Sequence, residues 1–305
     1  MNAVATLIAP PSVTLDESVV LSARSALVAL GADAGAPDWL APGTACDLPF
    51  GNLAPEQAEA AIRHALANAT PTGPTLDIFA QPFATRRKRL LIADMESTII
   101  EQEMLDELGD YVGLKDHIAD ITNRAMNGEI DFKEAVRKRV ALLKGLKESV
   151  IDEVWQRATL MPGAAQLIAT MRANGAACVL VSGGFRCFTR KVRDWVGFND
   201  DRGNGLEIVD GVMTGRVEEP ILDKDSKLEA LLAYAGEHRV PMVETMAVGD
   251  GANDLPMLLA AGLGVAYHAK PAVAAEARAR VDHGDLTALL YAQGYRIDEF
   301  KDHVS

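Results

Sequence analysis

The sequence is poor in the residues that build disulfide frameworks and zinc sites. Its 305 residues include three cysteines, Cys46, Cys178 and Cys187, and none of them has the C-x-x-C spacing of a redox or metal motif. The six histidines are scattered along the chain. The sequence therefore implies neither a disulfide scaffold nor a zinc centre, and we interpret the cysteines as buried thiols in a reducing compartment.

Long hydrophobic runs are also missing. No apolar stretch approaches the roughly 20 residues that are needed to span a bilayer. The first residues, M-N-A-V-A-T-L-I-A-P-P, lack the basic start and the long apolar core of a secretory signal. We therefore expect a cytoplasmic protein without a membrane partner.

Positive charge is in deficit. The chain has 30 lysines and arginines against 43 aspartates and glutamates, which gives a net charge of -13. Because an acidic surface repels a phosphate backbone, we expect no nucleic-acid partner. Any anionic substrate must therefore meet cations that are placed locally.

The signatures of several enzyme classes are absent. The sequence has no G-x-x-x-x-G-K-[ST] phosphate loop, no H-E-x-x-H zinc helix and no G-x-S-x-G nucleophile elbow. Metal chemistry in this chain would therefore rest on oxygen ligands.

An uneven distribution of basic residues predicts a domain boundary. Up to Thr85 the only basic residues are Arg24 and Arg63, whereas residues 86–89 read R-R-K-R. This tetrad could be a nuclear signal or a nucleic-acid contact, but we interpret it as a solvated linker in an acidic protein. The prediction is a small domain over residues 1–85 and a larger one over residues 86–305.

The first 85 residues have the pattern of a small α+β domain. Strand-like runs occupy residues 5–9 and 77–80, helical spacing covers 18–30 and 55–67, and weaker strand signals lie around Trp39 and over 47–50. This order predicts a β-α-β-β-α-β sandwich that resembles the small regulatory ACT domains. The resemblance implies an amino-acid sensor, a scaffold or a homodimer contact, and we see no diagnostic ligand motif.

From Leu90 onward strands alternate with helical segments, which predicts an α/β fold with a doubly wound parallel sheet. Strand candidates cover residues 90–93, 177–181, 245–248 and 263–267. Between the first two strands, residues 103–160 show helical spacing with few breakers, so we expect a helical cap. The dipeptide Asp210-Gly211 predicts a hairpin turn.

Three of the expected strands end in polar residues. In chain order these residues are Asp94 with Glu96, then Ser182 with Gly183, and then Asp250 with Asn253 and Asp254. The carboxyl ends of parallel strands share one edge of the sheet, where ligands bind. We therefore expect a single pocket.

These residue types suit phosphoryl transfer. The Asp94 carboxylate can attack phosphorus to give an aspartyl-phosphate, and Asp94, Asp250 and Asp254 offer the hard oxygen ligands that Mg²⁺ prefers. Glu96 lies two residues further, on the same side of an extended chain, and is the candidate general acid and base. Lys227 could neutralise the phosphoryl charge. Taken singly, each has a plainer interpretation: a turn aspartate, a glycine turn after Ser182, a solvated lysine.

Together the segments D-M-E-S-T, V-S-G-G-F, S-K-L-E and G-D-G-A-N-D resemble, in order, the four motifs of the haloacid dehalogenase superfamily. The chain is similar in particular to the phosphoserine phosphatases, from Leu90 to the C-terminal region. That resemblance implies the following roles: Asp94 as nucleophile; Asp250 and the backbone carbonyl of Glu96 as Mg²⁺ ligands, supported by Asp254; Ser182, Gly183 and Lys227 as phosphate ligands, with Asn253 ordering the pocket.

The same resemblance assigns substrate contacts to the cap. Glu103 would bind an ammonium group, Met126 and Phe132 would form an apolar screen, and Arg139 would bind a carboxylate. The plainer interpretation makes the two apolar residues part of the cap core and Arg139 a surface charge. The implied reaction is the Mg²⁺-dependent hydrolysis of O-phospho-L-serine to L-serine and phosphate, the last step of L-serine biosynthesis.

One residue departs from the family pattern. Glu96 stands where the family usually has aspartate, and its carboxyl group reaches one methylene further.

The alternatives to the implied function are a related small-molecule phosphatase or phosphotransferase, and an amino-acid sensor with a secondary catalytic half.

Overall fold

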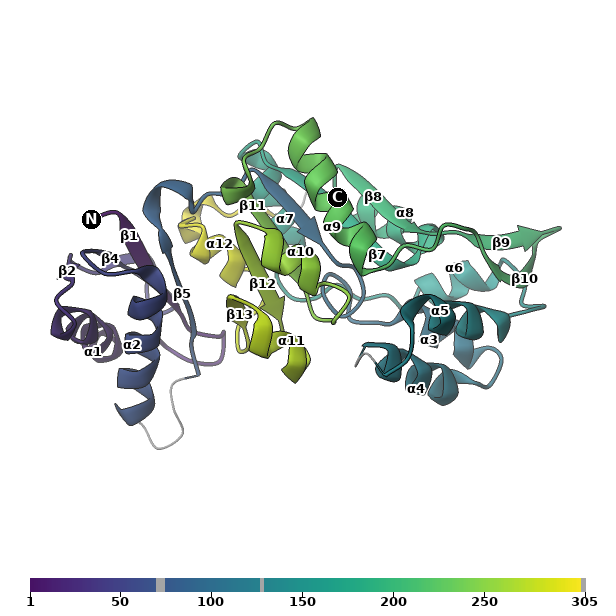
Figure 1. The fold of residues 1–305 in the computed structure, drawn as a ribbon, viewed down its shortest axis with the longest axis horizontal. Coiled ribbons are helices and arrows are strands. Elements are labelled where there is room, and N and C mark those ends of the chain that lie inside the picture. Colours follow the sequence, from purple (N-terminus) through teal and green to yellow (C-terminus); the bar gives the residue numbers. More distant parts are fainter. Residues whose placement is uncertain (70–74, 127–128, 303–305) are drawn as a thin grey trace.

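The computed structural model describes residues 1–69, 75–126 and 129–302. Three parts follow one another along the long axis of the molecule: an antiparallel sheet with two helices, a central parallel sheet between helices, and a helical cap (Figure 1). None of the helices in the described part of the chain has the length and apolarity to span a bilayer.

The amino-terminal sheet has the strand order β2-β4-β1-β5, with β3 paired to β4, and its pairs are antiparallel. Helices α1 and α2 pack on one face of it. The predicted element order is confirmed, with the short strand β2 added. The elements are β1 (Ala3–Ile8), α1 (Glu17–Ala29), β2 (Asp33–Ala34), β3 (Asp38–Ala41), β4 (Ala45–Gly51), α2 (Pro55–Ala69) and β5 (Asp77–Pro82).

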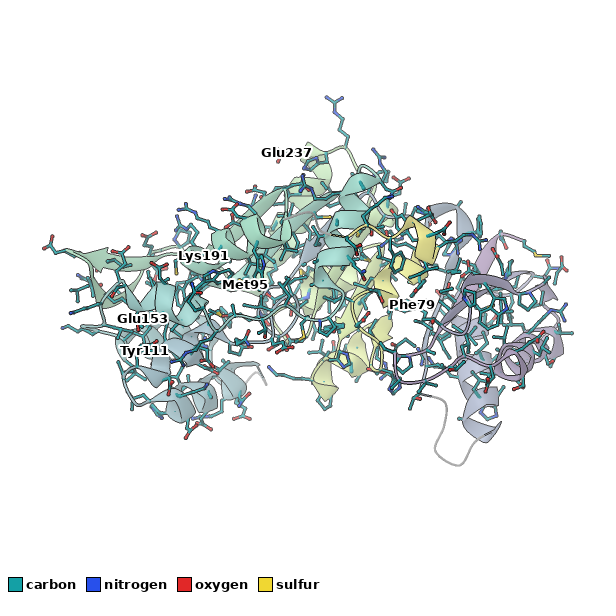
Figure 2. All side chains as sticks on the ribbon, turned by 180° about the vertical axis from the view of Figure 1, so that it is seen from behind. Phe79, Met95, Tyr111, Glu153, Lys191 and Glu237 are labelled. Carbon is teal, nitrogen blue, oxygen red and sulfur yellow. The ribbon has the colours of Figure 1, made fainter. Side chains whose placement is uncertain are left out.

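Both faces of this small sheet are buried, because its second face packs against the larger domain. Successive side chains of a strand point to opposite faces. Accordingly, Ile78 joins the core beneath the two helices, whereas Phe79 joins the core of the central sheet (Figure 2).

The central sheet confirms the predicted doubly wound fold. Its six strands have the order β13-β12-β11-β6-β7-β8, and every neighbouring pair is parallel. The strands are β6 (Leu90–Ala93), β7 (Ala177–Phe185), β8 (Asp200–Asn204), β11 (Thr245–Gly249), β12 (Leu263–Tyr267) and β13 (Ala279–Val281).

Helices cover both faces of the central sheet. Leu91 and Leu180 pack with one helical layer, whereas Ile92 and Val179 pack with the other. The first layer contains α7 (Ala164–Ala173), α8 (Arg186–Val196) and α12 (Ala288–Ala292), and the second contains α9 (Lys224–Glu237), α10 (Leu255–Ala260) and α11 (Pro271–Glu276). Single 3₁₀ turns are η1 (Phe83–Thr85), η2 (Met242–Glu244) and η3 (Ile297–Glu299).

The insert between β6 and β7 is helical, as the spacing predicts. It holds α3 (Met104–Asp110), α4 (Lys115–Met126), α5 (Phe132–Ala141) and α6 (Val150–Trp155). A hairpin of β9 (Leu206–Val209) and β10 (Val212–Val217) lies beside it. Its turn residues Asp210 and Gly211 have φ values of 51° and 73°, as the predicted two-residue turn requires.

The hairpin is bonded to the cap. The N–H of Gly145 donates to the carbonyl of Met213 at 2.9 Å, and the N–H of Met213 donates to the carbonyl of Leu146 at 2.8 Å. A third bond joins the N–H of Glu148 to the carbonyl of Gly211 at 2.9 Å. The cap therefore consists of two separate chain segments.

The expectation that residues 86–89 form a solvated linker is wrong for Lys88 and for the half-buried Arg86, whereas Arg87 and Arg89 are exposed. Lys88 is buried, and its ammonium group donates to the carbonyls of Thr85 and Val243 at 2.8 Å each. Burial lowers the pKa of Lys88 to about 8. The Arg87 guanidinium lies 3.6 Å from the ring centre of Tyr295. Lys88 therefore binds backbone carbonyls away from solvent, whereas Arg87 packs on the ring from an exposed position.

The three cysteines are free thiols. Cys46 and Cys178 are buried and Cys187 is partly buried, and burial raises the pKa of each thiol to about 12. These thiols are therefore in the unreactive protonated form at neutral pH.

Candidate active site

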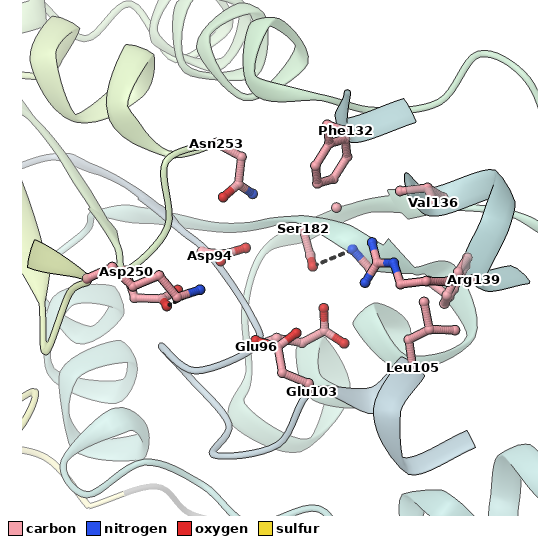
Figure 3. Close-up of a pocket in the computed structure, with 14 residues that line it drawn as sticks. Asp94, Glu96, Glu103, Leu105, Phe132, Val136, Arg139, Ser182, Asp250 and Asn253 are labelled. Atoms are coloured by element: carbon pink, nitrogen blue, oxygen red, sulfur yellow. Dashed lines mark hydrogen bonds and ion pairs between the residues drawn. The ribbon is translucent and has the colours of Figure 1, made fainter. Parts of the chain in front are cut away.

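A cavity lies where the carboxyl ends of the central strands face the cap (Figure 3). Its lining combines charged groups of both signs with apolar side chains. The sheet side contributes Asp94, Glu96, Ser182, Gly183, Gly184, Phe185, Asp250, Asn253 and Lys270, and the cap side contributes Glu103, Leu105, Phe132, Val136 and Arg139. Residues that follow three of the predicted strands thus line one cavity, as the sequence predicts.

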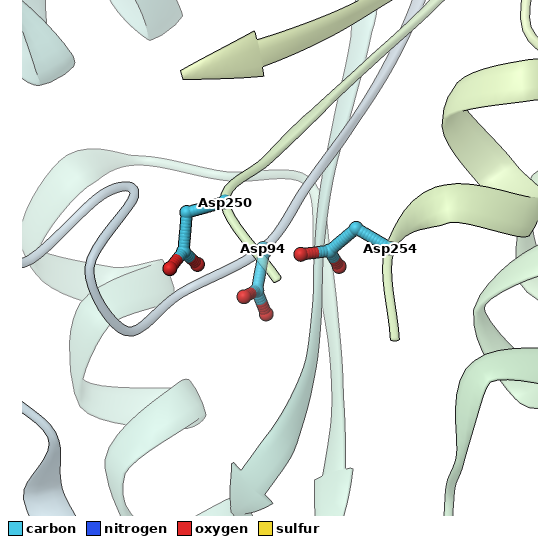
Figure 4. A group of neighbouring side chains, drawn as sticks. All are labelled: Asp94, Asp250 and Asp254. Carbon is cyan, nitrogen blue, oxygen red and sulfur yellow. The ribbon is translucent and has the colours of Figure 1, made fainter. Parts of the chain in front are cut away.

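Three carboxylates converge at one end of this cavity. One oxygen each of Asp94, Asp250 and Asp254 lies within 4.8 Å of the other two (Figure 4). Burial and then the charge of Asp254 raise the pKa of Asp94 to about 8 and that of Asp250 to about 7. Crowded like charges in a buried site are unfavourable without a cation, so this cluster has the hard oxygen donors and the negative charge that suit Mg²⁺.

Lys227 is the cation that the chain itself supplies to this cluster. Its Nζ donates to Oδ1 of Asp94 and to Oδ1 of Asp254, at 2.6 Å each. Burial lowers the pKa of Lys227, but the two carboxylates raise it more, so the net pKa lies above its ordinary value. The solvated-lysine interpretation is therefore wrong. One ammonium group compensates only one of the three negative charges that the ionised carboxylates would carry, so a divalent cation would neutralise the other two.

Helix α9 holds Lys227 in place through its first turn. Asp223 is the N-cap residue, and its side chain accepts from the N–H groups of Asp225 and Ser226 at 3.1 and 3.2 Å. Ser226 Oγ accepts in return from the N–H of Asp223 at 3.2 Å, which completes a capping box. Lys227 follows directly in the sequence.

The segment G-D-G-A-N-D depends on a glycine at its start. A Cβ atom on Gly249 would lie 2.4 Å from Cγ of Asp254, a distance that real Cβ atoms do not show. Asp254 in turn accepts from the N–H of Gly251 at 3.0 Å. Asn253, from the same segment, is buried, and its Oδ1 has no hydrogen-bond partner in the described part of the chain. A buried amide oxygen without a partner suits a site that binds a ligand or an ion.

Glu96 reaches across to the cap. Its Oε1 accepts from the N–H of Met104 at 2.8 Å, at the start of α3. Burial raises the pKa of Glu96 well above its ordinary value, and the neighbouring charge of Glu103 adds to that rise. Glu103 itself accepts from the hydroxyl of Ser97 at 2.9 Å. Glu96 is therefore biased toward the protonated form that a general acid needs.

The two glycines after Ser182 are required by close neighbours. A Cβ atom on Gly183 would lie 2.8 Å from Cζ of Phe132, and one on Gly184 would lie 2.7 Å from Oε2 of Glu96. The N–H of Gly184 donates to the Ser182 hydroxyl oxygen at 2.8 Å. This turn therefore brings backbone and hydroxyl groups close to both the cap and the acid.

The cap contributes a buried cation. Arg139 is 5% exposed and donates to the Thr122 hydroxyl at 2.8 Å and to the Ala135 carbonyl at 3.3 Å. Burial lowers its pKa, and the charges of Glu96, Asp106 and Glu103 oppose that effect. The surface-charge interpretation of Arg139 is therefore wrong.

The structure brings most of the predicted site residues together. Two of them, Lys227 and Asp254, are hydrogen-bonded to each other but do not line the cavity. Lys227 also donates to Asp94, and Asp254 also accepts from Gly251. The side chain of Met126 lies outside the described part of the chain. The cavity also contains Gly184, from the predicted glycine pair after Ser182, and four residues that the sequence analysis did not assign to the site: Leu105, Val136, Phe185 and Lys270.

Lys270 is the missed residue with the clearest chemistry. Its Nζ lies 3.9 Å from Oδ2 of Asp250, and its backbone N–H donates to the Asp250 carbonyl at 3.2 Å. Lys270 follows β12, a strand that the sequence analysis did predict. Its carboxyl end lies on the same edge of the sheet as the other three, and this rule could have identified the residue.

Comparison with known proteins agrees with this geometry. The family model of the haloacid dehalogenase-like hydrolases matches residues 91–259. Phosphoserine phosphatase SerB2 of Mycobacterium tuberculosis is 45% identical over 211 residues, which are 69% of this chain and 52% of that protein. The phosphoserine phosphatase of Lactococcus lactis is 43% identical over 203 residues, 67% of this chain and 94% of that protein.

Among solved structures, a phosphoserine phosphatase determined as an analogue of its phospho-aspartyl intermediate matches this chain with a TM-score of 0.65 and 34% identity. The match covers 67% of this chain and 98% of that chain. The chain spans only about half the length of some curated relatives that it matches, such as the mycobacterial protein at 52%. The family assignment rests on the match over residues 91–259 together with these relatives. The chain therefore belongs to the haloacid dehalogenase-like hydrolases and, among them, to the phosphoserine phosphatase family.

Proposed function

We propose that this protein is a Mg²⁺-dependent phosphatase that hydrolyses O-phospho-L-serine to L-serine and phosphate through an aspartyl-phosphate. The observation that carries the proposal is the position of Asp94, which accepts from Lys227 and lies beside two further carboxylates at one end of a cavity whose cap side holds Glu103 and Arg139. A phosphorylated amino acid has one cation and two anionic groups, and this cavity offers complementary charges to all three.

In the first step a carboxylate oxygen of Asp94 attacks the phosphorus. Because Lys227 occupies Oδ1, Oδ2 is the oxygen available to attack. The new Oδ2–P bond forms as the bond from phosphorus to the serine oxygen breaks, and Glu96 protonates that oxygen as it leaves. Two displacements then replace one difficult hydrolysis.

In the second step water attacks the phosphorus of the phosphoenzyme. Glu96, now ionised, accepts a proton from that water, and the Asp94 carboxylate is released with inorganic phosphate. Bound Mg²⁺, held by Asp94, Asp250 and the Glu96 carbonyl with support from Asp254, would neutralise charge on the phosphoryl group. The relative solved as a phospho-aspartyl intermediate analogue supports this assignment.

The remaining groups would orient the substrate. We assign the phosphate to Ser182, Gly183 and Lys227, the substrate ammonium to Glu103 and the substrate carboxylate to Arg139, with Asn253 ordering the pocket and Met126 and Phe132 screening it. The Glu96 carboxyl group lies near Gly184 on the floor of this pocket. It is thus close to both the nucleophile and the cap.

The cap would have to open for the substrate to enter. The cavity has a free volume of about 30 Å³, which is room for roughly one or two water molecules. Closure over the substrate would exclude bulk water from the phosphoenzyme.

We further propose two domains, residues 1–85 and 86–305, with a cap at about 103–160. A cytoplasmic location, a homodimer through the first domain and a role as the last step of L-serine biosynthesis belong to the same proposal.

Phosphate release tests the nucleophile, the metal and the substrate together. We expect the purified protein to release phosphate from O-phospho-L-serine with Mg²⁺ and to stop when the metal is chelated. Asp94→Asn should be inactive, whereas Asp298→Asn, at an exposed site, should keep full activity. Efficient turnover of sugar phosphates with phosphoserine left untouched would overturn the substrate assignment.

A further inference from the structure

We propose that Asn204 is a positioning residue that holds two phosphate-binding segments, residues 182–184 and the start of α9, in one orientation. This inference rests on the proposed function, because it takes Ser182 and Lys227 to be phosphate ligands. Asn204 itself does not line the cavity, and it would act through the groups that it binds.

The need for Asn204 begins with a bulge in strand β7. Val181 pairs with Arg202 and Phe185 pairs with Asn204, so four steps along β7 face two steps along β8. A bulge leaves the intervening backbone groups outside the regular ladder, and bulges are common beside active sites. The carbonyl of Gly183 lies in this bulge. The Asn204 side-chain amide donates to it at 2.7 Å and so replaces the missing ladder partner.

That bond sets the direction of a whole peptide unit. The carbonyl of Gly183 and the N–H of Gly184 belong to one planar trans peptide, in which they point in opposite directions. When Asn204 holds the carbonyl on one side, the N–H points to the other side and donates to the Ser182 hydroxyl oxygen at 2.8 Å. The hydroxyl oxygen thus accepts from the backbone, which leaves the Ser182 proton free to donate into the cavity.

The other end of the same amide holds the lysine helix. Asn204 Oδ1 accepts from the N–H of Leu222 at 2.8 Å. Leu222 precedes Asp223, the N-cap residue of α9, and Lys227 lies in the first turn of that helix. Asn204 therefore links the serine turn and the lysine helix through a single side chain.

Only a side chain with one donor and one acceptor in this place can make both bonds. Asn204 is 2% exposed, so a lost bond cannot be replaced by bulk water without structural change. An ionised aspartate would keep the bond from Leu222 but would repel the Gly183 carbonyl. A protonated aspartate would restore a donor.

The experiment compares Asn204→Asp and Asn204→Ser with the wild type, in the full chain with Mg²⁺. The measurements are kcat and KM for O-phospho-L-serine, the affinity for inorganic phosphate by calorimetry, and the melting temperature. We expect kcat and phosphate affinity to fall on the order of 10- to 100-fold, since a small misplacement of reacting groups has effects of that size. The activity of Asn204→Asp relative to wild type should recover as the pH is lowered and the carboxyl group protonates.

Asn199→Asp is the matched control. Asn199 Oδ1 accepts from the N–H of Cys178 at 2.8 Å, at the opposite end of β7, so the same chemical change occurs far from the phosphate groups. It should leave kcat and phosphate affinity unchanged.

Three outcomes would overturn the inference. They are folded Asn204 variants with wild-type kcat and phosphate affinity, a lower melting temperature as the sole change, and a failure of both variants to fold, which would make Asn204 purely structural. Failure of the proposed function is seen separately, in the wild type. If the wild type binds phosphate but ignores phosphoserine, the calorimetry still decides the role of Asn204.

Discussion

The Asp77 carboxylate in strand β5 accepts a hydrogen bond from the backbone N–H of Gly284, at 2.7 Å across the boundary between the two sheets. The N–H groups of Asp282 and His283 donate to the other oxygen of the same carboxylate, at 2.8 and 3.2 Å. Asp77 is 2% exposed. One buried side chain thus satisfies three backbone donors of the larger domain, and the small domain is docked by specific polar contacts.

Asp77→Ala should therefore destabilise the protein. The substitution leaves three backbone donors without their acceptor, and one unsatisfied buried group costs about 1–3 kcal/mol. We expect the free energy of unfolding, measured by urea denaturation, to fall by an amount in that range or above it. Asp33→Ala, at an exposed position of β2, is the control. A loss below about 0.5 kcal/mol, the usual size for a surface change, would show that the contact is dispensable.

Mg²⁺ should raise the melting temperature, and Asp250→Asn should reduce that rise. A ligand at 100 times its Kd stabilises the folded state by about 2.7 kcal/mol. Asp250 contributes to the raised pKa of Asp94, so the variant also relieves repulsion and should melt higher than wild type without metal. Differential scanning calorimetry with and without Mg²⁺ measures both effects. If Mg²⁺ raised the melting temperature of Asp250→Asn as much as that of the wild type, Asp250 would be excluded as a metal ligand.

The pH dependence of catalysis should report Glu96. The pKa of Glu96 is raised, and its protonated form is the proposed acid, so kcat/KM should fall as the pH rises through that pKa. The charge of Glu103 contributes to the rise. Glu103→Gln should therefore lower the pKa of Glu96 and move the descending limb to lower pH.

The control for this profile is Glu101→Gln, because Glu101 lies close in sequence but is exposed. The descending limb of the kcat/KM profile of Glu101→Gln should coincide with that of the wild type. A Glu103→Gln limb that stays in place, or moves to higher pH, would remove Glu96 from the acid role.

Gly183→Ala should impair closure of the cap. The added methyl group would lie 2.8 Å from Cζ of Phe132, so the cap cannot close fully until that ring moves. We expect KM for phosphoserine to rise on the order of tenfold. The double variant Gly183→Ala with Phe132→Leu should recover part of the loss, because the smaller side chain leaves space. Strictly additive effects of the two substitutions would show that the two residues do not interact.

The sequence predicts the chemistry of the site better than its surroundings. Asp94, Ser182 and Asp250 each follow a continuous apolar run in the sequence, and the carboxyl ends of parallel strands meet at one edge. Strand β8 was missed because its sequence, D-D-R-G-N, has no hydrophobic pattern. It pairs at the edge of the sheet, where partners and not propensity decide the structure.

The burial of Lys88 could not be predicted from sequence for a related reason. A run of basic residues usually indicates a solvated surface, whereas Lys88 is buried against carbonyls from η1 and η2. The acceptor in η2, the carbonyl of Val243, comes from a distant part of the chain, so no local pattern reveals it. Arg139 is similar: its sequence context suggests an exposed helix position, and only the packing of α4 on α5 buries it.

The hydrogen bonds between the β9–β10 hairpin and residues 145–148 bear on protein engineering. A chimaera that borrows the substrate preference of a relative by exchanging only residues 103–160 would retain a foreign hairpin against the new helices. Both segments would need to be transplanted together. Loop grafting confined to the helical insert should give misdocked and poorly active hybrids.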